Sequence, residues 1–355
     1  MTKPAVVDLF SGCGGGSLGF LAAGFRVVGA VEIESDPASS YARLVGTAPT
    51  IADIRDVSGS DLVGGLGSGN ELTLLFGCPP CQSFTILRRG GAPVALDAAR
   101  DTLPAEYLRL VTELNPRHIA FENVPGFAEG RGRAEFERLI SDVTDLGYTT
   151  VWQVLDAADF GVPQHRRRLL VLGSRIGPPK LPAPTHGPGR LDHVTVRRAV
   201  ADLRPLESGE VDPDDPMHRA RRHRAIALER LRCVPEGGGR MDLPERLRLR
   251  CHGDHDGHLD IYGRMSWDRP APTLTSGCTN VTRGRFGHPE QHRAITPREA
   301  LLLQSFPCEA ELTGGAESIA LQIGNAVPPL LARRIGEAVL SVDRASEPVS
   351  LGARD

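Results

Sequence analysis

The chain of 355 residues has no uninterrupted apolar run long enough to cross a membrane, and it has no basic start followed by an apolar stretch. A membrane-spanning helix needs about 20 successive apolar residues, so the first absence excludes such a helix. The second absence leads us to expect no secretory signal peptide. We therefore expect a cytoplasmic protein with no membrane partner. Its size favours two domains.

Lysine is almost missing, because it occurs only at positions 3 and 180, whereas arginine is abundant. This bias is typical of a GC-rich genome and indicates no function by itself. Arginines nevertheless concentrate between residues 217 and 250, where ten of them stand against four acidic residues. Such a segment suits phosphate binding. The alternative is a solvated helix face.

The seven cysteines are scattered and odd in number, which excludes the disulfide framework of a small secreted protein. Cys78 and Cys81 have CxxC spacing, but no second CxxC pair exists to complete a structural zinc site. The other Cys/His cluster, at 251–258, falls in a different part of the chain. A redox pair would open a long helix in a thioredoxin-like unit, which this context lacks. A nucleophilic cysteine at a strand end remains, and no metal site is predicted.

Short apolar strands alternate with helices in the first half of the chain. Strands are predicted over 5–9, 26–31, 72–76, 118–121, 150–155 and 168–172. Alternation of this kind is typical of an α/β fold with a mainly parallel, doubly wound sheet. From about residue 177 a Pro- and Gly-rich linker leads into a stretch without clear periodicity, which predicts a smaller, irregular second domain.

Polar and glycine residues follow several of these strands, where α/β folds bind ligands. The Gly-rich loop at 11–16 lets a ligand approach the backbone, and Glu32 at the end of the next strand suits the hydroxyls of a ribose. Asp53 is a candidate for the same edge, although a turn or cap explains its position equally well. Glu122 closes another strand and suits a general acid, or again a cap.

The segment "PQHRRRL" at 163–169 offers a third set of polar groups. Because side chains alternate along an extended chain, Gln164, Arg166 and Arg168 share one face. An amide beside two guanidinium groups suits a polar ring and phosphates. The alternative is a solvated strand edge.

Taken in order, these segments resemble the DNA (cytosine-5) methyltransferase family of bacterial type. The resemblance runs from Val7 to about Val339 and is weakest over 177–260. It is carried by "DLFSGCGGGSLGF", Glu32, "ADI" at 52–54, "GCPPCQSFT", "RDTL" at 100–103, "FENVPGF", "PQHRRRLLVLG", "TPREALLLQSFP" and "QIGNAVPP".

This resemblance implies a Rossmann-like S-adenosylmethionine-binding catalytic domain over 1–176, completed by 318–345, and a target-recognition domain with its hinge over 177–317. The cofactor site would comprise Phe10, Gly12, Gly14, Glu32, Asp53, Pro80, Leu103 and Asn325. Cys81 would be the nucleophile; Glu122, Arg166 and Arg168 would hold the cytosine, with Gln164 supporting them. The implied partner is double-stranded DNA, and the protein is expected to be a monomer. The resemblance leaves open whether the enzyme acts alone or is paired with a cognate restriction endonuclease.

Three alternatives stay open at this point. One eukaryotic branch of the family modifies tRNA, but its Cys-Phe-Thr element is absent here, where Gly277-Cys-Thr279 stands nearest. A DNA-binding regulator without activity would have lost Cys81, Glu122 or Arg168. A nicotinamide oxidoreductase would leave the cysteine and arginine segments without a role.

Within the CxxC segment, Cys78 is expected to pack against the end of the strand, so that Cys78→Ala leaves methylation largely intact.

Overall fold

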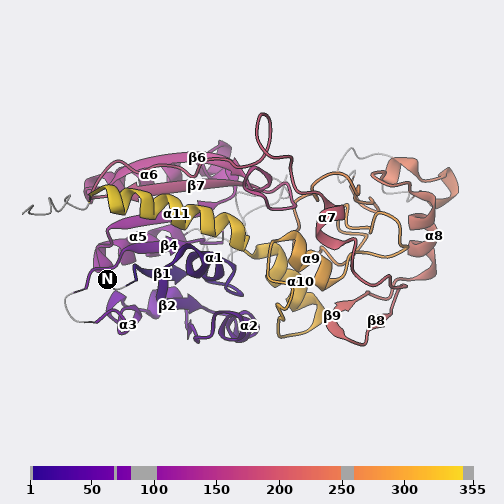
Figure 1. Cartoon of the computed structure of the whole chain (residues 1–355), viewed down its shortest axis with the longest axis horizontal. Helices are drawn as coiled ribbons and strands as arrows, with labels where there is room; N and C mark the ends of the chain where they lie inside the picture. The colour runs from indigo at the N-terminus through magenta and orange to yellow at the C-terminus, as the bar shows by residue number, and fades with distance from the viewer. Residues whose placement is uncertain (1–2, 68–69, 81–101, 249–259, 347–355) are drawn as a thin grey trace, which may run out of the picture.

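The protein is built on one large sheet with a loop-rich region beside it (Figure 1). The computed structural model describes residues 3–67, 70–80, 102–248 and 260–346. The strands of the large sheet are β1 (Ala5–Leu9), β2 (Arg26–Glu32), β3 (Thr50–Ile51), β4 (Leu74–Gly77), β5 (His118–Asn123), β6 (Thr149–Asp156) and β7 (Arg167–Ser174).

The sheet has seven strands in the order β3-β2-β1-β4-β5-β7-β6. Strands β1 to β5 pair in parallel, whereas β7 runs antiparallel to both β5 and β6. The carboxyl ends of the parallel strands therefore meet the start of β7 at one edge. The predicted α/β fold with a doubly wound sheet is confirmed, and the antiparallel β7 is an addition that the sequence did not indicate.

Helices cover both faces of the sheet, because alternate strand residues face opposite apolar clusters. Val7 and Leu75 face the cluster that contains the α5 residue Tyr107, and Val6 and Leu74 face the cluster that contains Ile335 of α11. The helices are α1 (Gly15–Ala23), α2 (Ser35–Val45), α3 (Gly59–Leu62), α5 (Leu103–Leu114), α6 (Arg133–Asp145), α7 (Val196–Val200), α8 (Ala225–Cys233), α9 (Pro297–Leu303), α10 (Ala316–Asn325) and α11 (Pro329–Ser346). Among the described ranges, no helix has both the length and the apolarity needed to cross a bilayer.

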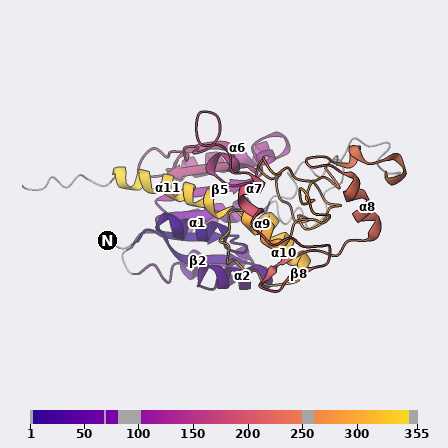
Figure 2. The same cartoon turned by 45° about the vertical axis from the view of Figure 1, so that its right-hand side comes forward.

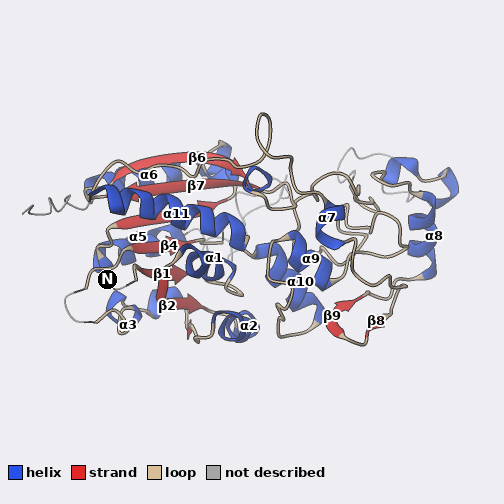
Figure 3. Cartoon of the chain, in the orientation of Figure 1, coloured by secondary structure: helices blue, strands red, loops and turns tan. Residues whose placement is uncertain are grey.

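The loop-rich region, residues 177–317, has little regular structure, as Figure 3 shows. The short hairpin of β8 (Val211–Asp212) and β9 (Asp215–Arg219) is its only named sheet in the part of the chain that the structure describes. Its cores are an apolar cluster around Trp267 and Leu301 and a smaller one around Leu231. Helix α10 joins the first of these clusters, and so does Cys13 of the Gly-rich loop. The described structure thus agrees with the predicted irregular second region, while its exact boundaries stay a prediction.

Candidate active site

The Gly-rich loop folds around the carboxylate of Glu32. Phe10 and Gly12 have φ angles of 59° and 55°, in the left-handed region. This turn aims the Gly12 N–H at Glu32 Oε2, to which it donates at 2.8 Å, while the Glu34 N–H donates to Oε1 at 2.9 Å. The loop and the end of β2 therefore form one unit, as the resemblance implies for a cofactor site.

Glu32 is only 9 % exposed. Burial raises the pKa of its carboxyl group above the usual range, and the backbone N–H groups that point at it oppose this shift. Next to this acid, Ile33 and Ile51 are each 59 % exposed, although both are large and apolar. Exposed apolar side chains of this kind suit contact with a flat ring. Neither was predicted from the sequence, although Ile33 directly follows the acid.

The remaining cofactor candidates lie in different settings. Asp53 caps a short helical turn by accepting from the Arg55 N–H at 3.0 Å, and it pairs with the Arg55 side chain at 2.9 Å. Leu103 is buried at the start of α5. Pro80 and Asn325 are exposed, at the turn after β4 and at the end of α10 respectively. The capping role left open for Asp53 is therefore present, whereas a role in cofactor binding stays a prediction for all four.

The chain returns from α10 to pack directly on the Gly-rich loop and α1. A Cβ atom added to Gly15 would lie 2.2 Å from the carbonyl oxygen of Val327. One added to Gly19 would lie 2.3 Å from that of Pro329. Figures 1 and 2 both show α11 lying along α1. The segment after α10 therefore lies against the Gly-rich loop and α1, more than 300 residues away in the sequence.

The second polar centre surrounds Glu122, which is 2 % exposed at the end of β5. Arg168 of β7 places its Nε 3.2 Å from Glu122 Oε1. The thiol of Cys78, directly after β4, donates to Glu122 Oε2 at 2.8 Å. Three adjacent strands thus deliver a carboxylate, a guanidinium and a thiol to one point. Cys81, the predicted nucleophile, lies outside the described residues.

Cys78 has more contacts than the sequence indicated. It packs against the apolar cluster behind the sheet, as predicted. Burial, together with the negative charge of Glu122, holds the pKa of its thiol well above the usual range. The group therefore stays S–H and can donate to the carboxylate. The predicted packing is confirmed, but the contact with Glu122 was not foreseen.

Gln164 and Arg166 share a buried face, whereas His165 and Arg167 point to solvent, as the alternation predicted. Arg166 is 2 % exposed, and burial, followed by the nearby charge of Arg168, lowers its pKa to about 9. The amide of Gln164 is held by three protein groups, the backbone of Leu274 and Leu303 and the side chain of Gln304. Of the predicted base-binding set, Glu122 and Arg168 are in direct contact, while Gln164 faces away into the protein.

The arginine-rich segment divides into two groups. Arg230 donates to the Leu247 carbonyl and to the Tyr262 hydroxyl, and Arg240 is buried. Arg221, Arg222 and Arg224 are exposed and fit the predicted phosphate-binding face. Cys251 and the histidines at 252, 255 and 258 lie outside the described residues. Among the described side chains, no group of His, Cys, Asp or Glu is arranged to hold a metal.

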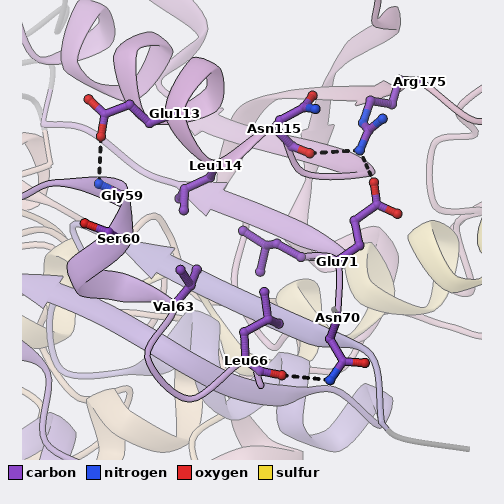
Figure 4. Close-up of a pocket in the computed structure, with 11 residues that line it drawn as sticks. Gly59, Ser60, Val63, Leu66, Asn70, Glu71, Glu113, Leu114, Asn115 and Arg175 are labelled. Atoms are coloured by element: carbon purple, nitrogen blue, oxygen red, sulfur yellow. Dashed lines mark hydrogen bonds and ion pairs between the residues drawn. The ribbon is translucent and has the colours of Figure 1, made fainter. Parts of the chain in front are cut away.

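A surface pocket of about 560 Å³ lies at the opposite edge of the sheet (Figure 4). Its wall includes Leu72 before β4, Asn115 after α5 and Arg175 after β7. Since β7 is antiparallel, its end marks the edge away from Glu32 and Glu122. The Arg175 side chain is also occupied, because it donates to the Asn115 carbonyl and pairs with Glu71. The pocket is therefore separate from both polar centres.

Comparison with known proteins gives one consistent answer. The family model described as C-5 cytosine-specific DNA methylase matches residues 5–341. The chain is 36 % identical over 343 residues to the Type II methylase M.HgiDII of Herpetosiphon aurantiacus, covering 94 % of each protein. It is 35 % identical to the Type II methyltransferase M1.HphI of Haemophilus parahaemolyticus, covering 95 % of this chain and 87 % of that one. The crystal structure of a putative DNA modification methyltransferase from an E. coli prophage shares the fold, with a TM-score of 0.75 at 23 % identity over 96 % of this chain and all of that one.

Proposed function

This chain belongs to the C-5 cytosine-specific DNA methylase family, and from this premise we propose how its own residues carry out the reaction. The protein is a DNA (cytosine-5-)-methyltransferase. The observation that carries our assignment is the buried Glu122 carboxylate, paired with Arg168 beside the turn that leads to Cys81. The relatives are named Type II enzymes. Accordingly, we propose that this protein modifies a short sequence in duplex DNA as the partner of a restriction endonuclease.

S-adenosylmethionine, which the family uses, fits the centre around Glu32. Glu32 accepts two backbone N–H groups and keeps further lone pairs for the ribose hydroxyls. A Cβ atom added to Gly12 would meet no described atom within 4 Å, so a ligand can approach this part of the backbone. We assign the cofactor to this centre, lined also by Phe10, Gly14, Ile33, Asp53, Pro80, Leu103 and Asn325. When bound, S-adenosylmethionine supplies the electrophilic methyl group.

In the proposed reaction Cys81 adds as a thiolate to C6 of cytosine, because C5 of the free ring is a poor nucleophile. Glu122 holds N3 and the exocyclic amine and favours a proton on N3 as negative charge develops. Arg168 binds O2 and fixes the Glu122 carboxylate through Oε1. Once C5 has been methylated, loss of the C5 proton and elimination of Cys81 restore the aromatic ring and the free enzyme.

This chemistry needs a cytosine outside the stacked duplex. Glu122 is buried, with 2 % of its surface exposed, so the base must leave the stack to reach it, which costs a few kcal/mol. We propose that the exposed arginines Arg221, Arg222 and Arg224 bind the phosphates of the opened DNA.

The direct test is a covalent adduct with duplex DNA that contains 5-fluorocytosine, in the presence of S-adenosylmethionine. Fluorine at C5 replaces the proton that must leave, so the adduct with Cys81 accumulates. We expect the adduct with the wild-type protein and with Cys78→Ala, and none with Cys81→Ala. An adduct that survives Cys81→Ala contradicts the assignment. Sequencing 5-methylcytosine in DNA from an expressing host without methylation of its own identifies the target sequence.

A further inference from the structure

Two alternate residues in the segment before β7 hold both backbone groups of Leu274. Gln164 Oε1 accepts from the Leu274 N–H at 2.9 Å, and Arg166 Nη1 donates to the Leu274 carbonyl at 3.3 Å. One residue earlier, the Thr273 hydroxyl donates to the His165 carbonyl at 2.7 Å. The segment 273–274 of the loop-rich region is therefore fixed to the strand that carries Arg168.

The same two side chains also reach the end of α10. Arg166 Nη1 donates to the Gly324 carbonyl at 3.1 Å, so one nitrogen serves Leu274 and Gly324 together. Gln164 Nε2 donates to Gln304 Oε1 at 3.0 Å, and Gln304 Nε2 donates to the Ile323 carbonyl at 2.5 Å. Asn325, a residue proposed for the cofactor site, follows directly.

These three segments have no room to shift independently. A Cβ atom added to Gly324 would lie 2.3 Å from the carbonyl carbon of Thr275, so the two backbones are in direct contact. Arg166 is a buried cation that is costly to desolvate, and within the described residues its Nε has no hydrogen-bond partner. Packing alone does not require a charge here, because an apolar side chain of equal length fills the same space.

We propose that Arg166 and Gln164 are positioning residues that couple DNA binding at segment 273–275 to cofactor binding beside Asn325. This inference rests on the proposed function, in which the duplex delivers a cytosine to Arg168, because segment 273–274 is hydrogen-bonded to the residues directly before Arg168. Displacement of Leu274 by DNA moves Arg166, and through the shared nitrogen it moves Gly324. The proposal is that DNA and cofactor favour the same arrangement of these contacts, and reciprocity then makes each strengthen the binding of the other by the same factor. In this role Arg166 acts through backbone contacts, whereas the resemblance implies that it holds the cytosine.

The test measures the dissociation constant of S-adenosylhomocysteine with and without a saturating duplex of the mapped target sequence. For the wild-type protein we expect DNA to strengthen binding at least about fivefold. The quantity compared is the ratio of the dissociation constant without DNA to that with DNA. In Arg166→Met this ratio should fall to within about twofold of unity, because the contacts with the Leu274 and Gly324 carbonyls are lost. Arg166→Lys keeps the charge and should give a ratio between those of Arg166→Met and the wild-type protein. If Arg166→Met fails to fold, Gln164→Leu is a second variant that disrupts the contact with Leu274.

Arg264→Met is the matched control, because Arg264 is also 2 % exposed and also donates to backbone carbonyls, those of Leu231, Val234, His288 and Gln291. It should lower the melting temperature and keep the wild-type ratio. A ratio near unity in the wild-type protein overturns the proposal, and so does an unchanged ratio in Arg166→Met. Methyl transfer to DNA by the wild-type protein is measured separately, so that failure of the proposed function is recognised on its own.

Discussion

At Glu122, the hydrogen bond from Cys78 shows how one small side chain affects a reacting group. The thiol donates to Oε2 while Arg168 holds Oε1, so the carboxylate is fixed from both sides. We expect Cys78→Ala to lower kcat about three- to tenfold, since a hydrogen bond to a charged group contributes about 1.5–3 kcal/mol and part of it is replaced by other contacts. Cys78→Ser keeps a donor and should recover most of the rate in a labelled-methyl assay.

Cys308 offers the control for this prediction. Its thiol also donates to a glutamate, Glu309, at 3.2 Å, but it is exposed and lies in the loop-rich region. Cys308→Ala should leave kcat unchanged. This expectation for Cys78 differs from the bystander role that its position in the sequence favoured. Equal rates for Cys78→Ala, Cys78→Ser and the wild-type protein would support the bystander role.

Glu122 itself should be far more sensitive. Glu122→Gln keeps the size and one acceptor but cannot supply or share a proton at N3. We expect kcat to fall about 10²- to 10⁴-fold, the usual range for a general acid or base, with the affinity for duplex DNA changed little. Gel-shift titration beside the rate assay separates the two effects. A variant that lost DNA binding to the same extent as kcat would assign Glu122 to binding and not to chemistry.

The sequence predicted Glu122 and Arg168 because each stands where a strand begins or ends. It did not predict their contact with Cys78, because that contact depends on the register of β4 against β5, in which Gly77 pairs with Phe121. No hairpin turn joins these two parallel strands to fix their register locally, so the register depends on packing across the sheet.

At the scale of elements, α1 packs directly against the backbone of α11 at Gly19. A Cβ atom there would meet the Pro329 carbonyl oxygen at 2.3 Å and the Arg333 nitrogen at 2.6 Å, both of which are backbone atoms. Gly19→Ala should therefore destabilise the protein by about 1–3 kcal/mol, as overpacking does, although alanine favours a helix by about 1 kcal/mol over glycine.

Gly64→Ala is the control for Gly19→Ala, because no described atom lies within 4 Å of its added Cβ and its φ is not in the left-handed region. Its free energy of unfolding should stay within about 0.5 kcal/mol of the wild-type value. Urea titration followed by circular dichroism measures both variants. A Gly19→Ala protein as stable as the control would show that α11 can move away from α1 at little cost.

Elements with strong periodicity were predictable, and the others were not. Strands β1 and β5 each contain three successive apolar residues, and the helix after Thr296 begins with a Thr, Pro and Glu at capping positions. The sequence of the loop-rich region shows no periodicity, because hydrogen bonds from side chains stabilise this region more than regular backbone hydrogen bonding does. Arg264 alone donates to four backbone carbonyls there, and an arginine in a sequence does not reveal whether it is buried.

At the scale of the whole molecule, buried groups in the two regions respond to pH in opposite directions. In the sheet, burial raises the pKa of Asp8 to about 7, so this group binds a proton more tightly in the native state than in the unfolded one. Its contribution to stability is present below the unfolded pKa of about 3.9 and is lost as pH rises through 7. In the loop-rich region, burial lowers the pKa of His288 and of His223 to about 4.

These two histidines make the native state less stable in acid. His288 Nδ1 accepts from the backbone N–H groups of Glu290 and Gln291 at 3.2 and 3.0 Å, so the ring is neutral in the fold. An unfolded histidine takes up a proton near pH 6.5. Between about pH 6.5 and 4, the unfolded state therefore binds more protons at these positions, and their contribution to stability is lost as pH falls.

His288→Asn isolates this contribution, because the asparagine oxygen accepts the same two N–H groups and does not titrate. We expect the wild-type free energy of unfolding to fall relative to that of the variant by up to about 1.4 kcal/mol per pH unit below pH 6.5. Urea titrations of both proteins at pH 7.5, 6 and 5 measure the difference, in which the opposing effect of Asp8 cancels. Parallel curves would mean that the His288 ring protonates inside the fold, and that Glu299, 3.7 Å from Nε2, compensates its charge there.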